Sequence, residues 1–419
     1  MKELLKNIIL DQQQLTWSDQ YIRRDFPVYF LTAKDVVVIS GVRRCGKSTL
    51  LHQIRQDSAE RDYYFNFDDE RLVNFTVEHF HLLHQVLIEL FGAQNTFYFD
   101  EIQNVAGWER FVRRLHDYGS KVFLTGSNAT MLSRELGTHL TGRYLRFELY
   151  PFSFAEFLRV RRISKGTAGR QDTRKKALIS RGFGDYFKTG GFPQYIDSGN
   201  DLYLKSLYES ILYRDVMVRN HLTHEHEVSV LVNYLAGNVS RLISYNSLTG
   251  ITGVKNPTTI KKYLDFLQDT YLLFQISKFD FSIKKQVQNP KKIYFIDHAL
   301  VSRLGFRFSE NLGRLLENLV FIELRRRNKE VWYHYGKHEC DFIIRTKETV
   351  TEAIQVCYSL SDPEVRKREL TGLAEAMQCY KLKHGTIITR EEKEEIRNDG
   401  LVISVVPVAE WLLEWPRIG

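Results

Sequence analysis

The sequence predicts an α/β protein with a parallel sheet, and three observations support this fold class. Short, fully apolar runs alternate with helical stretches from Val36 to about Pro151, as in parallel sheets that helices cover on both faces. A glycine-containing loop joins the first of these runs to a helix. The composition is that of a globular chain, because 43% of the 419 residues are hydrophobic, 26% are charged and only 8 are proline. Collagen-like and largely disordered proteins are therefore excluded.

The first elements follow in chain order. Residues 1–30 predict a surface helix and an aromatic lead-in, and residues 31–150 predict the α/β core. Four short apolar runs predict strands at 36–40, 62–67, 96–101 and 121–127. Helical stretches lie between them at 49–54, 81–90 and 109–117. Because strands and helices alternate, we expect the strands to pair in parallel.

A helical segment, 151–205, follows the core and carries the charge imbalance of the chain. The sequence has 59 Lys and Arg against 51 Asp and Glu, a net charge of +8 and a pI of about 9.1. Nine of the basic residues and one acid lie in Arg159–Arg181, so the other basic and acidic side chains balance at fifty each. This basic stretch is a candidate contact for nucleic acid, and a solvated loop is the alternative. The run Gly190–Pro193 predicts a turn or hinge.

Residues 206–305 predict a winged helix-turn-helix. A short helix and a turn precede a longer helix, and two extended runs follow it at 272–279 and 292–297. Asn256 is placed to cap the longer helix, with Pro257 at its first position. Its apolar face follows the spacing i, i+3, i+4, i+7, i+11 and consists of Ile260, Tyr263, Leu264, Leu267 and Tyr271.

The last residues, 306–419, predict a second, smaller α/β domain. Two helices are expected, at 311–327 and 362–380. Strands are expected at 331–335, 340–346, 351–359, 385–389 and 401–406.

Cysteine usage and hydropathy predict a cytoplasmic protein with no membrane segment. The four cysteines form no C-x-x-C pair, which is typical of a reducing compartment. No apolar run approaches the ~20 residues that a transmembrane helix needs. The first residues are too polar for a signal peptide.

The loop GVRRCGKS, from Gly41 to Ser48, matches the phosphate-binding pattern G-x-x-x-x-G-K-[ST]. Its glycines let backbone N–H groups wrap phosphates, Lys47 supplies a positive charge, and the Ser48 hydroxyl is a ligand for Mg²⁺. The following helix directs its N-terminus toward the anion. A chance match in a loop that binds no nucleotide is the alternative, and the preceding strand and following helix argue against it. We expect ATP and Mg²⁺ to be bound by Gly41, Val42, Arg43, Arg44, Cys45, Gly46, Lys47, Ser48 and Thr49.

Four further residues are candidates for the chemistry of hydrolysis. Asp100 and Glu101 end an apolar run, where Asp100 is the candidate Mg²⁺ carboxylate and Glu101 is placed to polarise an attacking water. Asn128, after Ser127, is placed to contact the γ-phosphate or position the water, with a plain turn as the alternative. Arg143 is a candidate arginine finger, acting within the subunit or across a subunit boundary, with a surface salt bridge as the alternative.

A set of motifs resembles the prokaryotic AAA-fold P-loop ATPases that carry a C-terminal domain of unknown function: GVRRCGKSTLL, FYFDEIQNVAGWERFVRRLHD, LTGSNATML, LTGRYLRFELYPFSFAEFL, TGGFPQYI, LYRDVMVRN and LLENLVFIELRRR. The resemblance covers nearly the whole chain. It implies a P-loop core, a helical lid at 151–205, a winged helix, and a restriction-endonuclease-like C-terminal fold. It also implies the following roles: Walker A for Gly41, Gly46, Lys47 and Ser48, Walker B for Asp100 and Glu101, and a sensor for Asn128.

The C-terminal domain departs from the nuclease pattern. Such a nuclease needs a helical acid, a strand Asp and then E/Q-x-K, so that the acids hold Mg²⁺ and the Lys steadies the water or phosphate. Glu317 and Asp341 are the candidate acids, and Gln355 stands at the third position. Cys357 replaces the Lys, and a neutral thiol supplies no cation. We therefore expect an inactive nuclease fold.

Two alternatives to an inactive domain stay open. Lys337 or Lys347 can supply the missing charge if folding brings it beside the acids. A metal site formed by His338, Cys340, Cys357 and Cys379 is also conceivable, although it lacks a recognised zinc spacing.

Lysines mark the predicted recognition helix and wing of the winged helix. They are Lys255, Lys261, Lys262, Lys284, Lys285, Lys291 and Lys292. Lysines at these places suit contacts with DNA phosphates, and a solvated face in a domain used for protein contacts is the alternative.

The sequence thus predicts Mg²⁺-dependent ATP hydrolysis that drives rearrangement of the winged-helix and nuclease-like domains, with DNA as an expected partner. Two other functions stay open: a slow nucleotide-dependent switch that recruits a protein partner, and an ATP-dependent nuclease. Assembly into a homo-oligomer also stays open, and it decides whether Arg143 acts within one subunit or between two.

Overall fold

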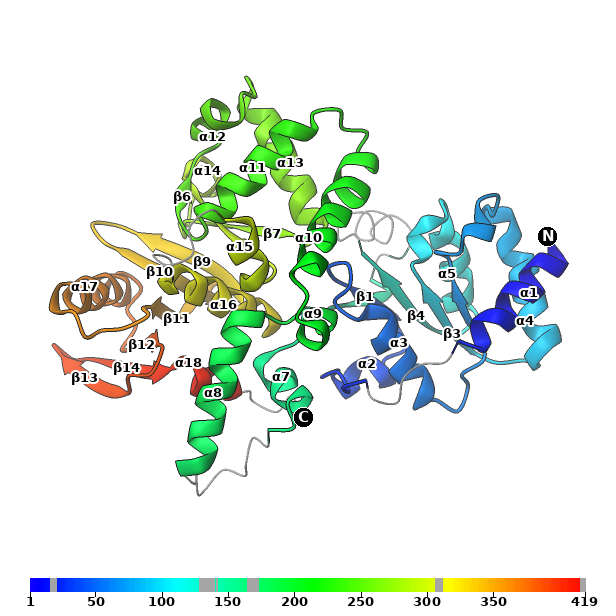
Figure 1. The fold of residues 1–419 in the computed structure, drawn as a ribbon, viewed down its shortest axis with the longest axis horizontal. Coiled ribbons are helices and arrows are strands. Elements are labelled where there is room, and N and C mark those ends of the chain that lie inside the picture. The colour runs from blue at the N-terminus through cyan, green and yellow to red at the C-terminus, as the bar shows by residue number, and fades with distance from the viewer. Residues whose placement is uncertain (16–20, 128–139, 141, 164–172, 306–311, 415–419) are drawn as a thin grey trace. The chain divides into compact units, whose positions relative to one another are not determined.

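The computed structural model describes residues 1–15, 21–127, 140, 142–163, 173–305 and 312–414 (Figure 1). These residues form two compact units, of which the first comprises Met1–Tyr150 and the second begins at Pro151. Among the helices of the described residues, none is both long and apolar enough to cross a membrane.

The first unit contains a five-stranded sheet in which every pairing is parallel, in the order β2-β3-β4-β1-β5. The strands are β1 (Val36–Ser40), β2 (Tyr64–Asn66), β3 (Thr96–Asp100), β4 (Lys121–Gly126) and β5 (Tyr144–Glu148). This confirms the predicted α/β fold class with a parallel sheet. Strand β5 was not predicted, because it is a half-buried edge strand that reads YLRFE rather than as an apolar run. Parallel pairing brings the carboxyl ends of β1, β3 and β4 to one edge of the sheet.

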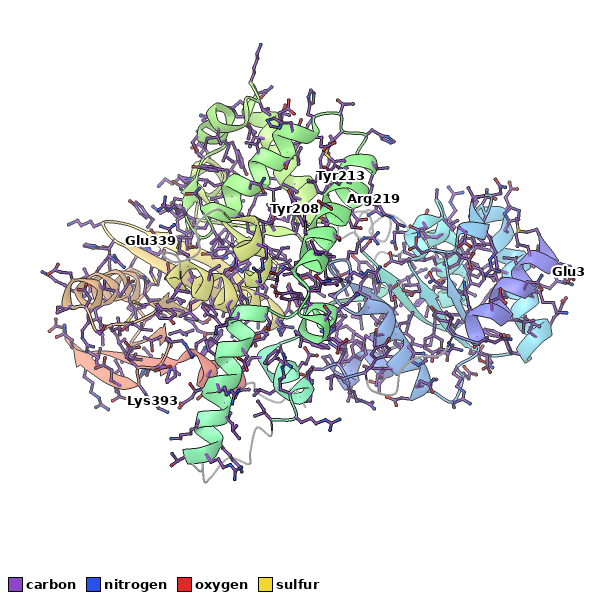
Figure 2. All side chains as sticks on the ribbon, viewed as in Figure 1. Glu3, Tyr208, Tyr213, Arg219, Glu339 and Lys393 are labelled. Carbon is purple, nitrogen blue, oxygen red and sulfur yellow. The ribbon has the colours of Figure 1, made fainter. Side chains whose placement is uncertain are left out.

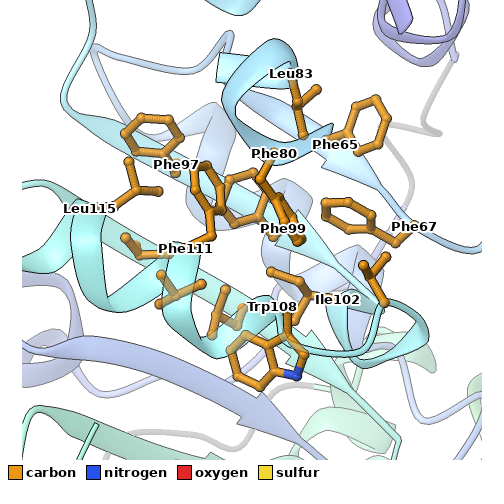
Figure 3. Close-up of a cluster of buried hydrophobic side chains, with 14 of the residues drawn as sticks. Phe65, Phe67, Phe80, Leu83, Phe97, Phe99, Ile102, Trp108, Phe111 and Leu115 are labelled. Atoms are coloured by element: carbon orange, nitrogen blue, oxygen red, sulfur yellow. The ribbon is translucent and has the colours of Figure 1, made fainter. Parts of the chain in front are cut away.

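Aromatic side chains fill the core of the first unit (Figure 3). Its helices are α1 (Lys2–Gln13), α2 (Val28–Thr32), α3 (Lys47–Gln56), α4 (Phe80–Phe91) and α5 (Trp108–Asp117), with the short turns η1 (Glu70–Leu72), η2 (Val77–His79) and η3 (Ile102–Asn104). The rings of Phe80 on α4 and Phe111 on α5 stack with centroids 4.6 Å apart. Phe80 also packs against Phe67, the residue after β2, and Phe111 packs against Phe99 on β3. The strand that ends in Asp100 is therefore held by a tightly packed core.

The second unit begins with helices. They are α7 (Phe154–Val160), α8 (Thr173–Thr189), α9 (Pro193–Ser198), α10 (Asp201–Ser210) and the π-helical η4 (Ile211–Val218). The predicted turn lies between α8 and α9, where the Gly191 N–H donates to Asp297 Oδ2 at 2.7 Å. Of the basic stretch, residues 164–172 lie outside the described residues, and the part from Thr173 is the start of α8 rather than a loop.

The next elements surround a three-stranded antiparallel sheet of order β6-β8-β7. In chain order they are α11 (Glu225–Gly237), β6 (Leu242–Ile243), α12 (Tyr245–Thr252), α13 (Pro257–Asp269), β7 (Leu273–Ser277), α14 (Ile283–Gln288) and β8 (Lys291–Phe295). Asn256 caps α13 as predicted, since its side chain accepts from the Thr258 N–H at 2.8 Å. The order of elements agrees with a winged helix, which stays a prediction. In the place of the wing, however, the chain forms the short helix α14.

The C-terminal part contains a six-stranded mixed sheet of order β13-β14-β12-β11-β10-β9. The elements are α15 (His298–Leu304), α16 (Leu312–Arg326), β9 (Glu330–Tyr335), β10 (Glu339–Thr346), β11 (Thr349–Val356), α17 (Pro363–Cys379), β12 (His384–Thr389), β13 (Glu394–Asn398), β14 (Leu401–Pro407) and α18 (Val408–Leu413). The predicted strands and helices are present. Strand β13 was missed, because it is a short and largely charged edge strand, EEIRN.

Candidate functional site

The phosphate-binding loop lies between β1 and α3, as its sequence predicts. Gly41 is packed so closely that a Cβ there would lie 2.2 Å from the Leu149 carbonyl oxygen. Gly46 has φ 100°, a left-handed conformation that glycine adopts without strain, and it forms the N-cap of α3. Each glycine is thus required by the backbone of the loop.

The N-terminus of α3 presents positive charge and backbone donors. Gly46 offers no side chain to cap the first N–H groups of the helix. Lys47 is 5% exposed, and its Nζ donates to the carbonyl oxygens of Gly41 and Val42 at 3.2 Å each. The only acid that the structure pairs with Lys47 in the described residues is Glu101, at 3.8 Å from Nζ to Oε1. These groups fit the negative charge of a nucleotide phosphate.

Asp100 ends strand β3 beside this loop and is 1% exposed. Thr125, on β4, donates its hydroxyl hydrogen bond to Asp100 Oδ1, and the Ser48 side chain also bonds this carboxyl. Burial and the charge of Glu101 raise the pKa of Asp100 to about 6, although these hydrogen bonds and Lys47 act in the opposite direction. Ser48 and Asp100 therefore lie together, as a shared Mg²⁺ site requires.

Glu101 adopts a left-handed backbone conformation, with φ 51° and ψ 40°. Its N–H donates to Thr125 Oγ1 at 3.0 Å, and its Oε2 accepts from Gln103 Nε2 at 2.5 Å. The Ser127 hydroxyl lies 3.5 Å from the same oxygen. A non-glycine residue in this conformation is strained, and such strain persists where surrounding contacts define a side chain's position. Thr125 and Gln103 are positioning contacts that the sequence interpretation missed.

Of the two remaining predicted catalytic residues, Asn128 and Arg143, the structure describes only Arg143. Asn128 lies outside the described residues, although the preceding Ser127 is buried beside Glu101. Arg143 precedes edge strand β5, and its Nη1 lies 2.6 Å from Asp117 Oδ1. That contact is the salt bridge named as the alternative for this arginine. Its role as an arginine finger stays a prediction.

Other members of the loop differ in exposure. Arg44 is exposed with φ 65°, and Arg43 and Thr49 are half-buried. Cys45 is buried, its thiol donates to the Leu149 carbonyl oxygen at 3.3 Å, and burial raises the pKa of that thiol. Cys45 thus packs the loop against the segment after β5 rather than presenting a thiolate.

Arg24 is a buried residue of the site that the sequence interpretation missed. Its Nη1 donates to the Cys45 carbonyl oxygen at 2.6 Å, and its Nη2 donates to the Tyr150 carbonyl oxygen at 2.7 Å. Its backbone N–H donates to Gln53 Oε1, on α3, at 3.0 Å. Arg24 therefore ties the lead-in segment to the phosphate-binding loop at Cys45, to the segment after β5 and to α3. Only its place among the aromatic residues of the lead-in distinguishes it in the sequence.

In the second unit, the structure brings the nuclease-like residues Glu317, Asp341 and Gln355 together. The Asp341 N–H donates to Gln355 Oε1 at 3.1 Å, and Lys292 Nζ lies 2.9 Å from an oxygen of each acid. Burial raises the pKa of the Cys357 thiol to about 11, so this residue supplies no charge. The lysine at the acids is thus Lys292, and the described residues form no group of three or more His, Cys, Asp or Glu arranged to hold a metal.

The predicted phosphate-contacting lysines divide into two groups. Those on or beside α13 and α14 are exposed: Lys255, Lys261, Lys262, Lys284 and Lys285. Lys291 and Lys292, on β8, are buried at 8% and 1% exposure. The expectation that these two contact DNA phosphate is wrong, because β8 is the central strand of its sheet and both side chains have partners within the unit.

Comparison with known proteins agrees with the geometry of the loop. An AAA domain model matches residues 33–158, and a model of a domain of unknown function (DUF8612) matches residues 180–311. The chain is 35% identical to the uncharacterized protein MJ1544 of Methanocaldococcus jannaschii, over 99% of this chain and 96% of that protein. It is 31% identical to an uncharacterized protein of Haemophilus influenzae, over 92% of this chain and 96% of that protein.

Among solved structures, the ORC2 protein of Aeropyrum pernix in its ADP form aligns with 12% identity and a TM-score of 0.31, over 73% of this chain and 97% of that chain. The long relatives and the AAA domain match carry the assignment. The chain belongs to the family of AAA-type P-loop ATPases that these relatives share.

Proposed function

We propose that this protein binds ATP with Mg²⁺ and hydrolyses it. The observation that carries the proposal is the convergence of the uncapped N-terminus of α3, Lys47, Ser48, Asp100 and Glu101 at one edge of the parallel sheet. A helix N-terminus and a lysine stabilise phosphate charge, and two adjacent carboxylates supply separate metal-binding and water-orienting groups.

Each residue has a defined part in this reaction. Lys47 binds the terminal phosphates, and Ser48 and Asp100 would hold Mg²⁺, which neutralises phosphate charge. Glu101 orients a water molecule, whose oxygen bonds to the γ-phosphorus as the bond to the ADP oxygen breaks. The Glu101 carboxylate accepts the proton that the water loses. Gln103 and Ser127 fix the direction of that carboxylate through the hydrogen bonds described above.

Phosphate release by Lys47→Ala and by a matched control tests this proposal. Lys34→Ala removes an exposed lysine of the same unit and is expected to keep wild-type turnover. Lys47→Ala is expected to abolish turnover while its circular dichroism and melting temperature stay close to wild type. Phosphate release at the wild-type rate by Lys47→Ala would exclude the assigned site.

We further propose that the protein engages DNA through α13. Lys255, Lys261 and Lys262 lie on or beside this helix, are exposed, and form no ion pair with the described residues. Lysines so placed contact phosphates and give salt-dependent, sequence-independent binding. The basic residues Arg174 and Lys176 at the start of α8 are also exposed and are a second candidate contact.

The salt dependence of DNA affinity separates these surfaces. Neutralising Lys255, Lys261 and Lys262 is expected to make the slope of log K against log salt less steep, by an amount that corresponds to the loss of about three phosphate contacts. Neutralising Arg174, Lys175 and Lys176 tests the basic stretch in the same way. An unchanged slope in either triple variant assigns that surface to solvent.

A slow switch that recruits a protein partner is the second candidate function, and one observation favours it. Phe281, Ile283 and Val287, on and before α14, are 84%, 76% and 64% exposed. Apolar side chains grouped on a surface suit a protein contact. Slow turnover that DNA does not change, together with ATP-dependent partner capture lost in Phe281→Ser, would favour the switch over the DNA-coupled ATPase.

The assembly state bears on both functions, since Arg143 can act in trans only in an oligomer. Specific ATPase activity measured across protein concentration tests this. Activity that rises with concentration, and that Arg143→Ala lowers, supports a homo-oligomer with a shared site.

A further inference from the structure

A cluster of charged side chains is buried in the second unit, where β8, α16 and β10 meet. Lys292 extends from β8, Glu317 from α16, and both Glu339 and Asp341 from β10. The Lys292 Nζ lies 2.9 Å from Glu317 Oε1, 2.9 Å from Asp341 Oδ1 and 2.5 Å from Glu339 Oε1. We call these four residues the Lys292 cluster. Figure 2 labels Glu339, the member of the cluster at the start of β10.

The buried carboxylates that pair with Lys292 also accept hydrogen bonds from other groups of the unit. The Tyr294 hydroxyl donates to Glu317 Oε1 at 2.6 Å, and the Val356 N–H donates to Asp341 Oδ2 at 3.0 Å. Lys292 is 1% exposed, whereas the side chain of Glu339 is 37% exposed and borders solvent. Buried carboxylates are stable only when paired and hydrogen-bonded, and here the ammonium meets that need.

The ammonium is held firmly in its charged form. Burial by itself lowers the pKa of Lys292, but the charges of Asp341, Glu317 and Glu339 outweigh it and raise that pKa well above its usual value. Burial and the charge of Asp341 raise the pKa of Glu317. The Lys292 Nζ lies 2.9 Å from an oxygen of each buried acid, so the ammonium occupies the place at which a nuclease-like site has its divalent cation.

Strand β8 and the residue before it are also joined to α16 and β9. The Asn318 side chain accepts from the Phe295 N–H at 2.7 Å and donates to the Phe295 carbonyl oxygen at 3.0 Å. The Tyr294 ring stacks on Phe321 with centroids 4.3 Å apart. The Tyr333 hydroxyl donates to the Pro290 carbonyl oxygen at 2.6 Å. The ion pairs of Lys292 and the Tyr333 hydrogen bond thus join the three-stranded sheet to the C-terminal sheet, and the Asn318 hydrogen bonds and the ring stacking join it to α16.

We propose that the Lys292 ammonium is the resident cation of this cluster. The C-terminal domain accordingly holds no divalent metal there and cleaves no nucleic acid. The cluster instead fastens β8 to α16 and β10. The three-stranded sheet, with α13, then moves together with the C-terminal sheet as one body. A nucleotide-driven rearrangement would displace both together rather than separate them.

Metal binding and cleavage test the first half of the proposal. Full-length wild type and Asp341→Asn are titrated with Mn²⁺ without nucleotide, and free Mn²⁺ is followed by electron paramagnetic resonance. Equal Mn²⁺ binding by the two proteins is expected, because any ion at the ATP site is common to both. Supercoiled plasmid is expected to stay intact with ATP and either Mg²⁺ or Mn²⁺. One Mn²⁺ lost in Asp341→Asn, or nicking that this variant removes, overturns the proposal.

Glu317→Gln repeats the comparison on α16 if Asp341→Asn does not fold. It removes the charge of the other buried acid and keeps the shape of the side chain. The expected and contradicting outcomes are the same as for Asp341→Asn.

A double-mutant cycle in thermal unfolding tests the second half. Lys292→Met is expected to lower the melting temperature by on the order of 10 °C, since it leaves buried carboxylates without their cation. Lys291→Met is the matched control, because Lys291 is the neighbouring buried lysine of β8 and its Nζ donates to Ser277 rather than to an acid. The double variant Lys292→Met/Asp341→Asn is expected to lower the melting temperature by less than the two single variants do when their decreases are added. Additive effects, or equal losses in the two lysine variants, contradict the fastening role.

Discussion

The two units each bury a lysine near carboxylates, and the surroundings of the two ammonium groups differ. Lys47 bonds two backbone carbonyl oxygens and stands 3.8 Å from one acid, at a helix N-terminus without a side-chain cap. Lys292 bonds three carboxylates within 2.9 Å, on the central strand of a sheet. The first lysine keeps capacity for an anionic ligand, whereas the second has its charge fully matched by its own chain. Burial and residue type alone do not distinguish a binding lysine from a structural one.

The sharpest test of this comparison removes each ammonium in turn. Lys47→Met is expected to abolish ATP hydrolysis and to keep the melting temperature near wild type. Lys292→Met is expected to lower the melting temperature and to keep turnover per folded molecule within about threefold of wild type. Phosphate release and calorimetry on the same preparations measure both effects. A loss of stability in Lys47→Met as large as that in Lys292→Met would remove the distinction.

Glu101→Gln tests whether the strained carboxylate does chemistry. Loss of a general base slows a reaction by roughly 10²–10⁴-fold, and we expect a reduction in kcat of this size. Nucleotide affinity is expected to stay within a few fold, since the amide keeps the hydrogen-bonding shape. Fluorescent-nucleotide binding and phosphate release separate the two quantities. Equal losses in affinity and turnover would assign Glu101 to binding.

Arg24→Ala tests the buried clamp on the phosphate-binding loop. Removing hydrogen bonds from a charged donor costs about 1.5–3 kcal/mol, which corresponds to a loss of roughly 10–100-fold if it acts on nucleotide affinity. The exposed neighbour Arg23 pairs with Asp57 and provides the control Arg23→Ala. We expect Arg24→Ala to weaken nucleotide binding and Arg23→Ala to leave it unchanged. Similar affinities of the two variants would argue against the clamp.

The raised pKa of Asp100 predicts a pH dependence. Its folded pKa of about 6 exceeds the ordinary 3.8, so the carboxyl favours folding at low pH, and this contribution is lost as pH rises through that interval. Asp100→Asn is therefore expected to gain stability relative to wild type between pH 5 and pH 7.5. Since Mg²⁺ needs the ionised carboxylate, Mg²⁺-dependent nucleotide affinity of the wild type is expected to fall below about pH 6. Thermal melts and isothermal titrations at both pH values measure these effects, and a pH-independent affinity would contradict the assignment.

The smallest effect is expected for the surface pair Arg143–Asp117. Exposed ion pairs contribute about 0–1 kcal/mol, so Arg143→Ala and Asp117→Asn are each expected to change the melting temperature by only a few degrees. Turnover decides the role of the arginine: a loss in Arg143→Ala that Asp117→Asn does not reproduce supports an arginine finger. Equal turnover in both variants would leave Arg143 only its salt bridge.

Much of the first unit was predictable because its signals are contiguous. The residues from Val36 to Gln56 form a strand–loop–helix whose apolar pattern and glycines define the local backbone. Asp100 was recognisable because it ends an apolar strand. Edge strands β5 and β13 were missed, since they lack the apolar run that marks a buried strand. Thr125 and Gln103 were missed because their importance arises from side-chain hydrogen bonds to the two acids.

The sequence by itself thus determined the α/β class, the phosphate-binding loop and the pair of acids, since each depends on neighbouring residues and local periodicity. Only the tertiary structure decided which lysine accompanies the C-terminal acids and which arginine fastens the loop. Lys292 meets acids 25 and 49 positions away, and Arg24 meets a carbonyl oxygen 126 positions away. Contacts over such separations depend on how sheets and helices pack, and no local pattern in the chain encodes them.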